Sequence, residues 1–460
     1  MKLYSKSLII FFTILSYVFS YSGLHLLPYL YILIWILIWS LYSLKKAMFF
    51  YLAILLIDGD ISKLGNIDNQ SFVTIYTEYI FGKSLFVFWT TFNFIVLLLI
   101  YIKKHFFKVD VFLFPFILVF LISLLIGITN FTLNPQSFIS DMGYLINFFV
   151  GFLIIWLFMR EKDVEKFFSI FIAVLFTKIF IIGLDSYYMS LSSFFNVYVA
   201  DTTVYLYPVL LIFFFLYLPN NLIIPLISIS LIFFLMMITA SRGRFITAAL
   251  TLLYGSFVSK KIHYLLIVSL VALVVFIIIS IWNQDIANYL MWKIQTFLPD
   301  DSNTIKMMSM SSMVRLIELK NIIQMHLDKI YTLFLGTGFG GYFTSIYFPY
   351  PFNLFDTSSY PDAWIIKDQF FKPHSSILFI VLKFGFCGFM FIYGTVIYLS
   401  FQTMRKVIKI KGRVNYNIYQ KIIVSLASFL PFLFFINYTS KLQIFSGVFF
   451  GILLMFYRKK

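Results

Sequence analysis

Long apolar runs separated by short polar connections dominate the chain. Runs close to the roughly twenty residues that a membrane-spanning helix needs recur at 8–22, 26–43, 47–58, 84–102, 111–129, 142–159, 166–184, 202–218, 222–240, 245–259, 263–282, 375–400, 421–437 and 442–457. They predict an all-α fold, a polytopic integral membrane bundle of about 12–14 transmembrane helices. The short run at 47–58 leaves the exact number open. The first run follows Lys2 and Lys6 as in a signal peptide, but the many later spans favour an uncleaved helix.

The basic residues fall on alternate connections between these runs. The clusters are Lys45–Lys46, Lys103–Lys104 with Lys108, Arg160–Lys166, Lys260–Lys261, Arg405–Lys421 and Arg458–Lys460. Because Lys and Arg collect in cytoplasmic loops, we expect these segments and both termini to be cytoplasmic. The remaining connections, which are neutral or mildly acidic, are then external.

One external connection, residues 283–373, is far longer than the usual link between bundled helices, and loops of that length are commonly functional. It divides the chain into an N-terminal transmembrane bundle (1–282), a long external loop (283–373) and C-terminal transmembrane helices (374–460). Within the loop, residues 313–329 are predicted to form a helix with an apolar stripe. The stripe consists of Leu316, Leu319, Ile323 and Leu327.

A glycine cluster, Gly336–Gly341, follows that predicted helix, and an aromatic-rich stretch comes after it. A nucleotide-binding loop is disfavoured, since no strand precedes the cluster and no Lys-Ser/Thr pair follows. The glycines instead predict a sharp turn or a close approach of two backbone segments.

Composition supports the membrane assignment and narrows the candidate chemistry. Hydrophobic residues make up 61% of the chain and charged residues 12%, with a mean hydropathy of +0.94, which excludes a soluble globular protein. The net charge of +16 is explained by the cytoplasmic loops rather than by nucleic acid as a partner. The single cysteine, Cys387, provides neither a disulfide nor a cysteine metal site. Asp300–Asp301 could hold a metal but, beside Pro299, favours an exposed turn.

Three arginines on the external side are candidates for anion binding. Arg242 and Arg244 lie in a predicted tight turn, 241–244, between two spans, where the orientation rule disfavours basic residues. Phosphate binding, for which the guanidinium fork is suited, is favoured over anchoring to lipid phosphate. Arg315 has Glu318 three residues on, so a surface ion pair is the local interpretation. Its place in the long external loop supports a functional one.

His374 follows Lys372-Pro373 where the external loop returns to the membrane. Proline is suited to the start of a helix, which places His374 in the first turn. The positive helix end there disfavours imidazolium, so we expect a neutral ring able to accept a proton. An interfacial or capping histidine is the alternative. Two lysines lie within apolar runs: Lys178 has Asp185 as a possible partner, and Lys383 has none in the local sequence.

Together these motifs resemble the O-antigen polymerase and O-antigen ligase superfamily over residues 222–400. The resemblance is carried, in chain order, by Ser241-Arg242-Gly243, Arg315, Leu335–Gly340, His374–Leu378 and Gly385-Phe386-Cys387-Gly388. Many members have His-Asn where this chain has His374-Ser375, so no role for an asparagine carries over.

The resemblance implies a GT-C-like membrane glycosyltransferase that acts at the external face of the bacterial cytoplasmic membrane without cofactor, metal or nucleotide. Its donor would be a glycan linked to undecaprenyl pyrophosphate. Arg242, Arg315 and Arg244 would bind the pyrophosphate, His374 and Arg315 would be catalytic, and His374 would accept the proton of the attacking hydroxyl. Loop aromatics would cover the sugars, and Asp356, Asp362 and Asp368 are candidates for binding sugar hydroxyls.

Polymerase, ligase and flippase are the three functions that this resemblance and the many spans leave open. In a polymerase the acceptor is a second lipid-linked repeat unit and a chain-length regulator (co-polymerase) is an expected partner. In a ligase the acceptor is the lipid A core. The Phe- and Ile-rich composition favours the polymerase. A lipid-linked glycan flippase would bury its charges near mid-bilayer, whereas this chain gathers Arg242, Arg315 and His374 at one face.

Overall fold

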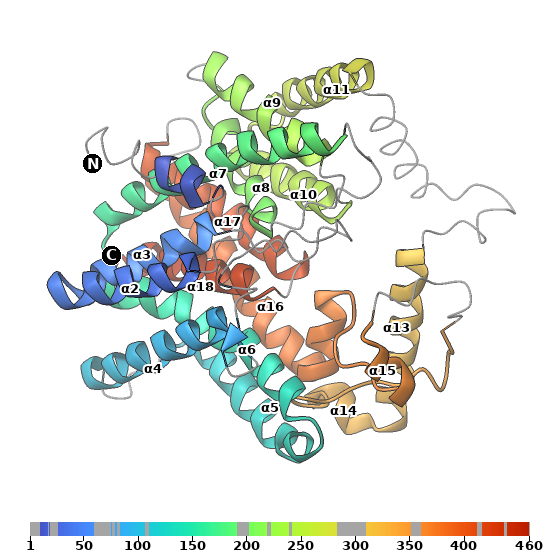
Figure 1. The fold of residues 1–460 in the computed structure, drawn as a ribbon. Helices are drawn as coiled ribbons and strands as arrows, with labels where there is room; N and C mark the ends of the chain where they lie inside the picture. The colour runs from blue at the N-terminus through green and yellow to red at the C-terminus, as the bar shows by residue number, and fades with distance from the viewer. Residues whose placement is uncertain are drawn as a thin grey trace, which may run out of the picture.

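The computed structural model describes residues 10–16, 18, 26–58, 75, 79–80, 83–105, 110–190, 202–218, 222–238, 242–282, 310–350, 360–411, 416–436 and 439–459. Their secondary structure is almost entirely helical, and long helices pack side by side in one bundle (Figure 1). The prediction of an all-α polytopic membrane protein is confirmed.

The helices follow the predicted apolar runs closely. In chain order they are α2 (Leu27–Leu41), α3 (Leu44–Ile57), α4 (Leu85–His105), α5 (Phe114–Leu133), α6 (Pro135–Phe158), α7 (Glu161–Ser190), η2 (Thr202–Leu206), α8 (Tyr207–Phe215), α9 (Ile223–Ile238), α10 (Arg242–Ser259), α11 (Tyr264–Trp282), α13 (Met310–Asp328), α14 (Ile330–Leu335), α15 (Asp362–Lys367), α16 (Ser376–Lys411), α17 (Ile418–Ile436) and α18 (Ser440–Arg458). A two-residue antiparallel pairing of β1 (Tyr79–Ile80) with β2 (Lys83–Ser84) precedes α4.

Six of the described helices are long and apolar enough to cross a membrane. They are Leu85–Lys104, Phe114–Leu133, Pro135–Phe158, Tyr264–Ile281, Ser376–Ile410 and Ser440–Arg458. Shorter apolar helices fill the predicted runs at 26–43, 202–218, 222–240, 245–259 and 421–437. The doubtful run at 47–58 is occupied by α3, a helix of only 14 residues.

Helices α6 and α18 form the centre of the bundle. Glycines let their backbones touch: a Cβ on Gly151 would lie 1.9 Å from the Ile444 carbonyl oxygen, and one on Gly447 would lie 2.0 Å from that of Phe148. Small residues at such contacts are typical of membrane helix packing. Around them aromatic rings interlock, with Phe116 and Phe148 stacked at 4.4 Å between ring centroids. By contrast, only 17% of the α11 span is buried, against 83% of α18.

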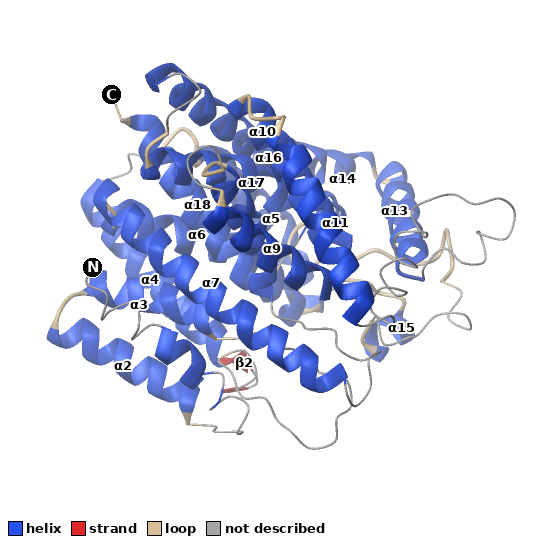
Figure 2. Cartoon of the chain, turned by 90° about the horizontal axis from the view of Figure 1, so that it is seen from above, coloured by secondary structure: helices blue, strands red, loops and turns tan. Residues whose placement is uncertain are grey.

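Charged residues from segments predicted to be cytoplasmic meet at one end of this bundle. Lys45 pairs with Asp163 at 2.8 Å and Lys459 with Glu161 at 2.7 Å, while Arg458 lies 2.5 Å from Asp110. The helices α13, α14 and α15 lie away from these pairs, and Figure 2 shows α13 and α15 on the far side of the bundle from α2. The arrangement agrees with the predicted alternation of the connections.

Helix α13 confirms the predicted loop helix, and its apolar stripe lies on the exposed face. The stripe residues Leu316, Leu319, Ile323 and Leu327 are exposed. The buried face carries Val314, Ile317 and Ile322, which pack in a cluster with Phe343, Tyr350, Tyr360, Phe370, Leu378 and Leu382. This face also carries buried Glu318, Asn321 and His326. Those polar residues concealed it in the sequence, because their partners come from other segments.

Candidate functional site

The glycine cluster lies directly against two membrane helices, which confirms the predicted close approach. Gly336, Gly338 and Gly340 have φ between 72° and 77°, in the left-handed region that favours glycine. A Cβ on Gly338 would lie 2.5 Å from the Gly127 nitrogen of α5. At about 1.5 Å of helix rise per residue, Gly127 lies about 9 Å inside the Leu133 end of α5. The cluster therefore dips into the bundle.

The other side of the glycine cluster packs against a break in α16. Gly385 has φ 65° inside the helix, so the carbonyl groups before it are free for other donors. Thr337 donates its backbone N–H to the Leu382 oxygen at 2.8 Å, and Gly338 donates to the Lys383 oxygen at 3.0 Å. From α5, the Asn130 side chain donates to the oxygens of Thr337 and Phe339 at 3.0 and 3.1 Å. Every one of these bonds fixes the cluster between α5 and α16.

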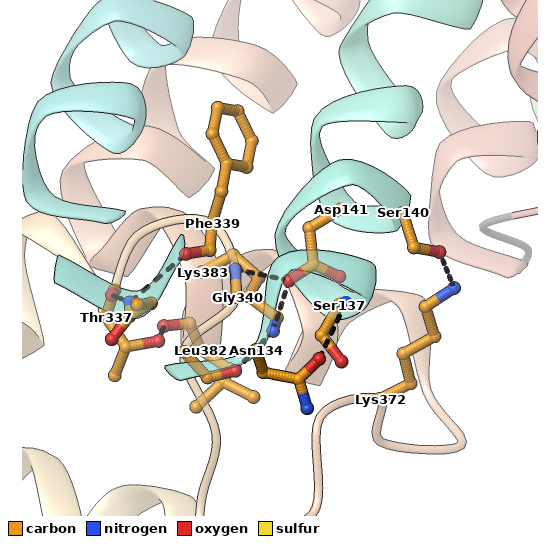
Figure 3. Close-up of polar contacts among 12 residues, drawn as sticks. Asn134, Ser137, Ser140, Asp141, Thr337, Phe339, Gly340, Lys372, Leu382 and Lys383 are labelled. Carbon is orange, nitrogen blue, oxygen red and sulfur yellow. Dashed lines mark hydrogen bonds and ion pairs between the residues drawn. The ribbon is translucent and has the colours of Figure 1, made fainter. Parts of the chain in front are cut away.

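A buried ion pair holds the same segment (Figure 3). Lys383 Nζ lies 2.6 Å from Asp141 Oδ2, and both side chains are 0% exposed. Asp141 Oδ2 also accepts the N–H of Gly340 at 2.8 Å, and Lys383 donates to the Gly341 oxygen. The sequence offered no partner for Lys383, because Asp141 lies on another helix, α6. The predicted pairing of Lys178 with Asp185 lies outside the described side chains.

His374 lies two residues before the first residue of α16, so the prediction that it lies in the first helical turn is wrong. Ser375 accepts the N–H of Phe379 at 2.9 Å, which makes Ser375 the residue that starts the helical hydrogen bonding. The helix itself begins at Ser376. The backbone N–H of His374 instead donates to both carboxylate oxygens of Glu318, at 2.9 and 3.0 Å.

The imidazole of His374 is held by the same carboxylate. Its Nδ1 lies 2.7 Å from Glu318 Oε1, and the Glu318 side chain is 0% exposed whereas that of His374 is 31% exposed. The Tyr360 hydroxyl also donates to Glu318 Oε1, and the Tyr360 ring meets the His374 ring edge to face at 4.8 Å. Burial, with the adjacent Glu318 charge, raises the pKa of Tyr360, which keeps this hydroxyl a donor.

Arg315 is exposed on α13, one turn before Glu318. The predicted surface ion pair between them is wrong, because the Glu318 carboxylate is buried and bound to His374 and Tyr360. Side chains three residues apart on a helix are neighbours, with Cβ atoms about 5–6 Å apart. Arg315 is therefore a neighbour on α13 of Glu318, the residue that holds His374.

Arg242 and Arg244 lie in the first turn of α10, so residues 242–244 are helical and the predicted turn at 241–244 is wrong for them. Their side chains lie outside the described part of the structure. Helix α10 packs antiparallel to α17: Lys261 lies over the Tyr416 ring at 5.9 Å, and a Cβ on Gly255 would touch Ser428. The first turn of α10 thus shares an end of the bundle with the C-terminus of α17.

That end of α17 contacts the start of α16. The Phe434 carbonyl oxygen accepts the hydroxyl of Ser376 at 3.3 Å, two residues after His374. The backbone of the α10 first turn and the His374 segment consequently lie at the same end of the bundle.

The acidic candidates are placed less favourably for binding sugars. Asp356 and Asp300–Asp301 lie outside the described residues. Asp362 is exposed at the start of α15. Asp368 accepts the Ser345 N–H at 2.9 and 3.2 Å and its hydroxyl at 2.6 Å, so this carboxylate fixes the loop. Sequence reasoning missed Glu318 as part of the site, although its position three residues after Arg315 was noticed.

Comparison with known families gives one match. Residues 227–393 match the family model described as O-antigen ligase. The matched stretch contains α10, α13, the glycine cluster and His374, and it confirms the resemblance to the O-antigen polymerase and ligase superfamily that the motifs indicate. No curated protein and no solved structure matches the chain.

Proposed function

From the O-antigen ligase match over residues 227–393, we propose that this multi-pass membrane protein is a glycosyltransferase of the O-antigen polymerase and ligase kind. It would transfer a glycan from undecaprenyl pyrophosphate to a sugar hydroxyl at the external face of the bacterial cytoplasmic membrane. The observation that carries this assignment is the partly exposed His374, whose imidazole is bound by the buried Glu318 carboxylate, on the same helix as Arg315.

In the proposed reaction the acceptor hydroxyl oxygen attacks the anomeric carbon of the donor glycan. The bond from that carbon to the pyrophosphate oxygen breaks, and its electron pair stays on the pyrophosphate. The hydroxyl proton passes to the free ring nitrogen of His374, which acts as the general base. His374 later releases it to solvent or to the departing pyrophosphate.

Arg315 and the arginines of the α10 first turn, Arg242 and Arg244, would bind the pyrophosphate. One guanidinium group can bind two phosphate oxygens at once. The arginines would also stabilise the negative charge that grows on the leaving group as the glycosidic bond breaks. His374 and Arg315 are then catalytic, and no step requires a metal or another cofactor.

The polymerase is the form of this activity that we propose, with a second lipid-linked repeat unit as acceptor and a co-polymerase as a possible partner. A flippase would need charged groups along a path through the membrane. The buried charges Asp141 and Lys383 instead neutralise each other and hold the glycine cluster.

Deletion of the gene in its native host, followed by gel analysis of the surface glycan, tests the proposal. A polymerase deletion leaves a single repeat unit on the surface, and the wild-type gene restores the long chains. Long chains that stay unattached would identify a ligase. Accumulation of lipid-linked units on the cytoplasmic face would identify a flippase and contradict the proposed chemistry.

A further inference from the structure

We infer that Glu318 is a positioning residue that fixes His374 with Nδ1 protonated, so that Nε2 is the nitrogen that accepts the hydroxyl proton. The inference rests on the proposed transfer reaction and adds to it the residue that sets the geometry and tautomer of the base. It follows from contacts between α13 and the segment that leads into α16.

The first contact fixes where His374 lies. Its backbone N–H donates to Glu318 Oε2 at 3.0 Å and to Oε1 at 2.9 Å. Because both oxygens of one carboxylate receive this N–H, the main chain just before Ser376 is tied to α13. The link joins residues 56 positions apart in the sequence, and it sets the distance between His374 and the turn of α13 that carries Arg315.

The second contact fixes the ring. An ionised carboxylate only accepts hydrogen bonds, so the 2.7 Å contact from His374 Nδ1 to Glu318 Oε1 requires the proton on Nδ1. A neutral imidazole carries a single ring proton, so Nε2 then has a free lone pair. A carboxylate that orients a histidine base in this way stabilises the imidazolium formed during the reaction without taking its proton.

Burial separates the roles of the two residues. The Glu318 side chain is 0% exposed, so it acts through His374, whose side chain is 31% exposed. Tyr360 supplies a further donor to Glu318 Oε1, and its hydroxyl is itself 3.2 Å from that of Tyr350. With the His374 backbone, the His374 ring and Tyr360 all donating, the carboxylate is held in a single orientation.

The decisive substitution is Glu318→Gln, which keeps the shape of the side chain and removes its charge. If the new side-chain amide turns its NH₂ toward the ring, it favours the tautomer with the proton on Nε2, which cannot accept the hydroxyl proton. We expect kcat to fall by about 10²–10⁴-fold and KM to stay within about threefold. Asp328→Asn is the matched control, since this exposed carboxylate at the end of α13 is bound, among the described residues, by Gln324 and Tyr347 and not by His374.

The assay uses full-length protein in detergent and the undecaprenyl-pyrophosphate-linked oligosaccharide that accumulates in the deletion host, with a radiolabelled glycan. Thermal unfolding of each variant is recorded alongside. Glu318→Gln should unfold below the wild-type temperature, because its NH₂ faces at least one donor in either orientation, so activity is compared at a temperature at which both proteins are folded. Activity of Glu318→Gln within twofold of wild type would overturn the inference.

A double variant separates positioning from a purely structural role. If Glu318 acts through His374, adding Glu318→Gln to His374→Ala should lower the residual rate no further. A second, multiplicative loss would show that Glu318 supports the fold or another group, and would also overturn the inference. Full activity of His374→Ala would instead refute the proposed base itself, so the two failures are distinguishable.

Discussion

Two acid–base pairs join the segments around the glycine cluster and His374 to neighbouring helices, and they differ in what surrounds them. Asp141 and Lys383 are both fully buried and bind the backbone of the glycine cluster. In the Glu318–His374 pair only the acid is buried, and the imidazole is partly exposed. The first pair therefore has its groups committed to structure, whereas the second keeps one group within reach of a substrate. A buried charge can thus indicate either a structural ion pair or a functional site. Exposure of one partner to solvent distinguishes the functional site.

The largest effect is expected from breaking the fully buried pair. Lys383→Met leaves the Asp141 carboxylate without its counter-charge, and the loss of one partner of such a pair costs about 3–5 kcal/mol of folding free energy. Folded protein in detergent, followed by gel filtration and thermal unfolding, should be strongly reduced. The Asp141→Leu/Lys383→Met double variant, which has no lone charge, should be more stable than either single variant. Single variants that unfold with the wild type would contradict the structural role of this pair.

At the partly exposed site, the arginines should affect activity and leave the fold intact. Arg315→Ala is expected to lower the transfer rate by about 10³-fold, the scale for losing a donor to developing negative charge. Arg315→Lys should recover a fraction only, since an ammonium cannot make the forked contact. Arg242→Ala and Arg242→Lys should behave in the same way.

Lys320→Ala is the control for these arginine variants. Lys320 is an exposed cation on the same helix, 5.2 Å from the centre of the Phe348 ring. Its loss should leave transfer by purified protein near the wild-type rate. If Arg315→Ala were as active as Lys320→Ala, Arg315 would have no part in catalysis.

A smaller effect is expected where the glycine cluster touches α5. Gly338→Ala places a methyl group 2.5 Å from the Gly127 nitrogen at φ 72°, and we expect a loss of about 1–3 kcal/mol of stability. Gly394→Ala is the control, because a Cβ added to this glycine inside α16 would meet no described atom within 4 Å beyond its chain neighbours and its own helix backbone. That control should match or slightly exceed wild-type stability in thermal unfolding. Equal unfolding of both variants would show that the cluster does not need its close approach.

Hydropathy predicted the membrane helices well because each span has to be apolar over its own length. The runs at 111–129 and 442–457 correspond to α5 and α18. The glycine cluster was also interpretable, since closely spaced glycines predict close backbone contact. What the local sequence could not supply were partners from other helices. Lys383 is neutralised from α6, and His374 is bound from α13.

The errors share this cause. Residues three apart on a helix are neighbours, which predicted an ion pair between Glu318 and Arg315. In the structure the Glu318 carboxylate is buried and binds His374 instead. On the same helix, Glu318, Asn321 and His326 lie on the buried face, whereas the stripe from Leu316 to Leu327 is exposed. Proline suggested a helix start at His374, yet the bond between His374 and Glu318 holds that residue outside the helix. Each of these features depends on tertiary contacts.

The most direct test of the account is a transfer assay with purified full-length protein and an undecaprenyl-pyrophosphate-linked repeat unit as the sole substrate. The account predicts that a lipid-linked product of two or more units and free undecaprenyl pyrophosphate appear together, and that His374→Ala lowers both by about 10²–10⁴-fold while unfolding at the wild-type temperature. Equal product formation by wild type and His374→Ala would contradict the account.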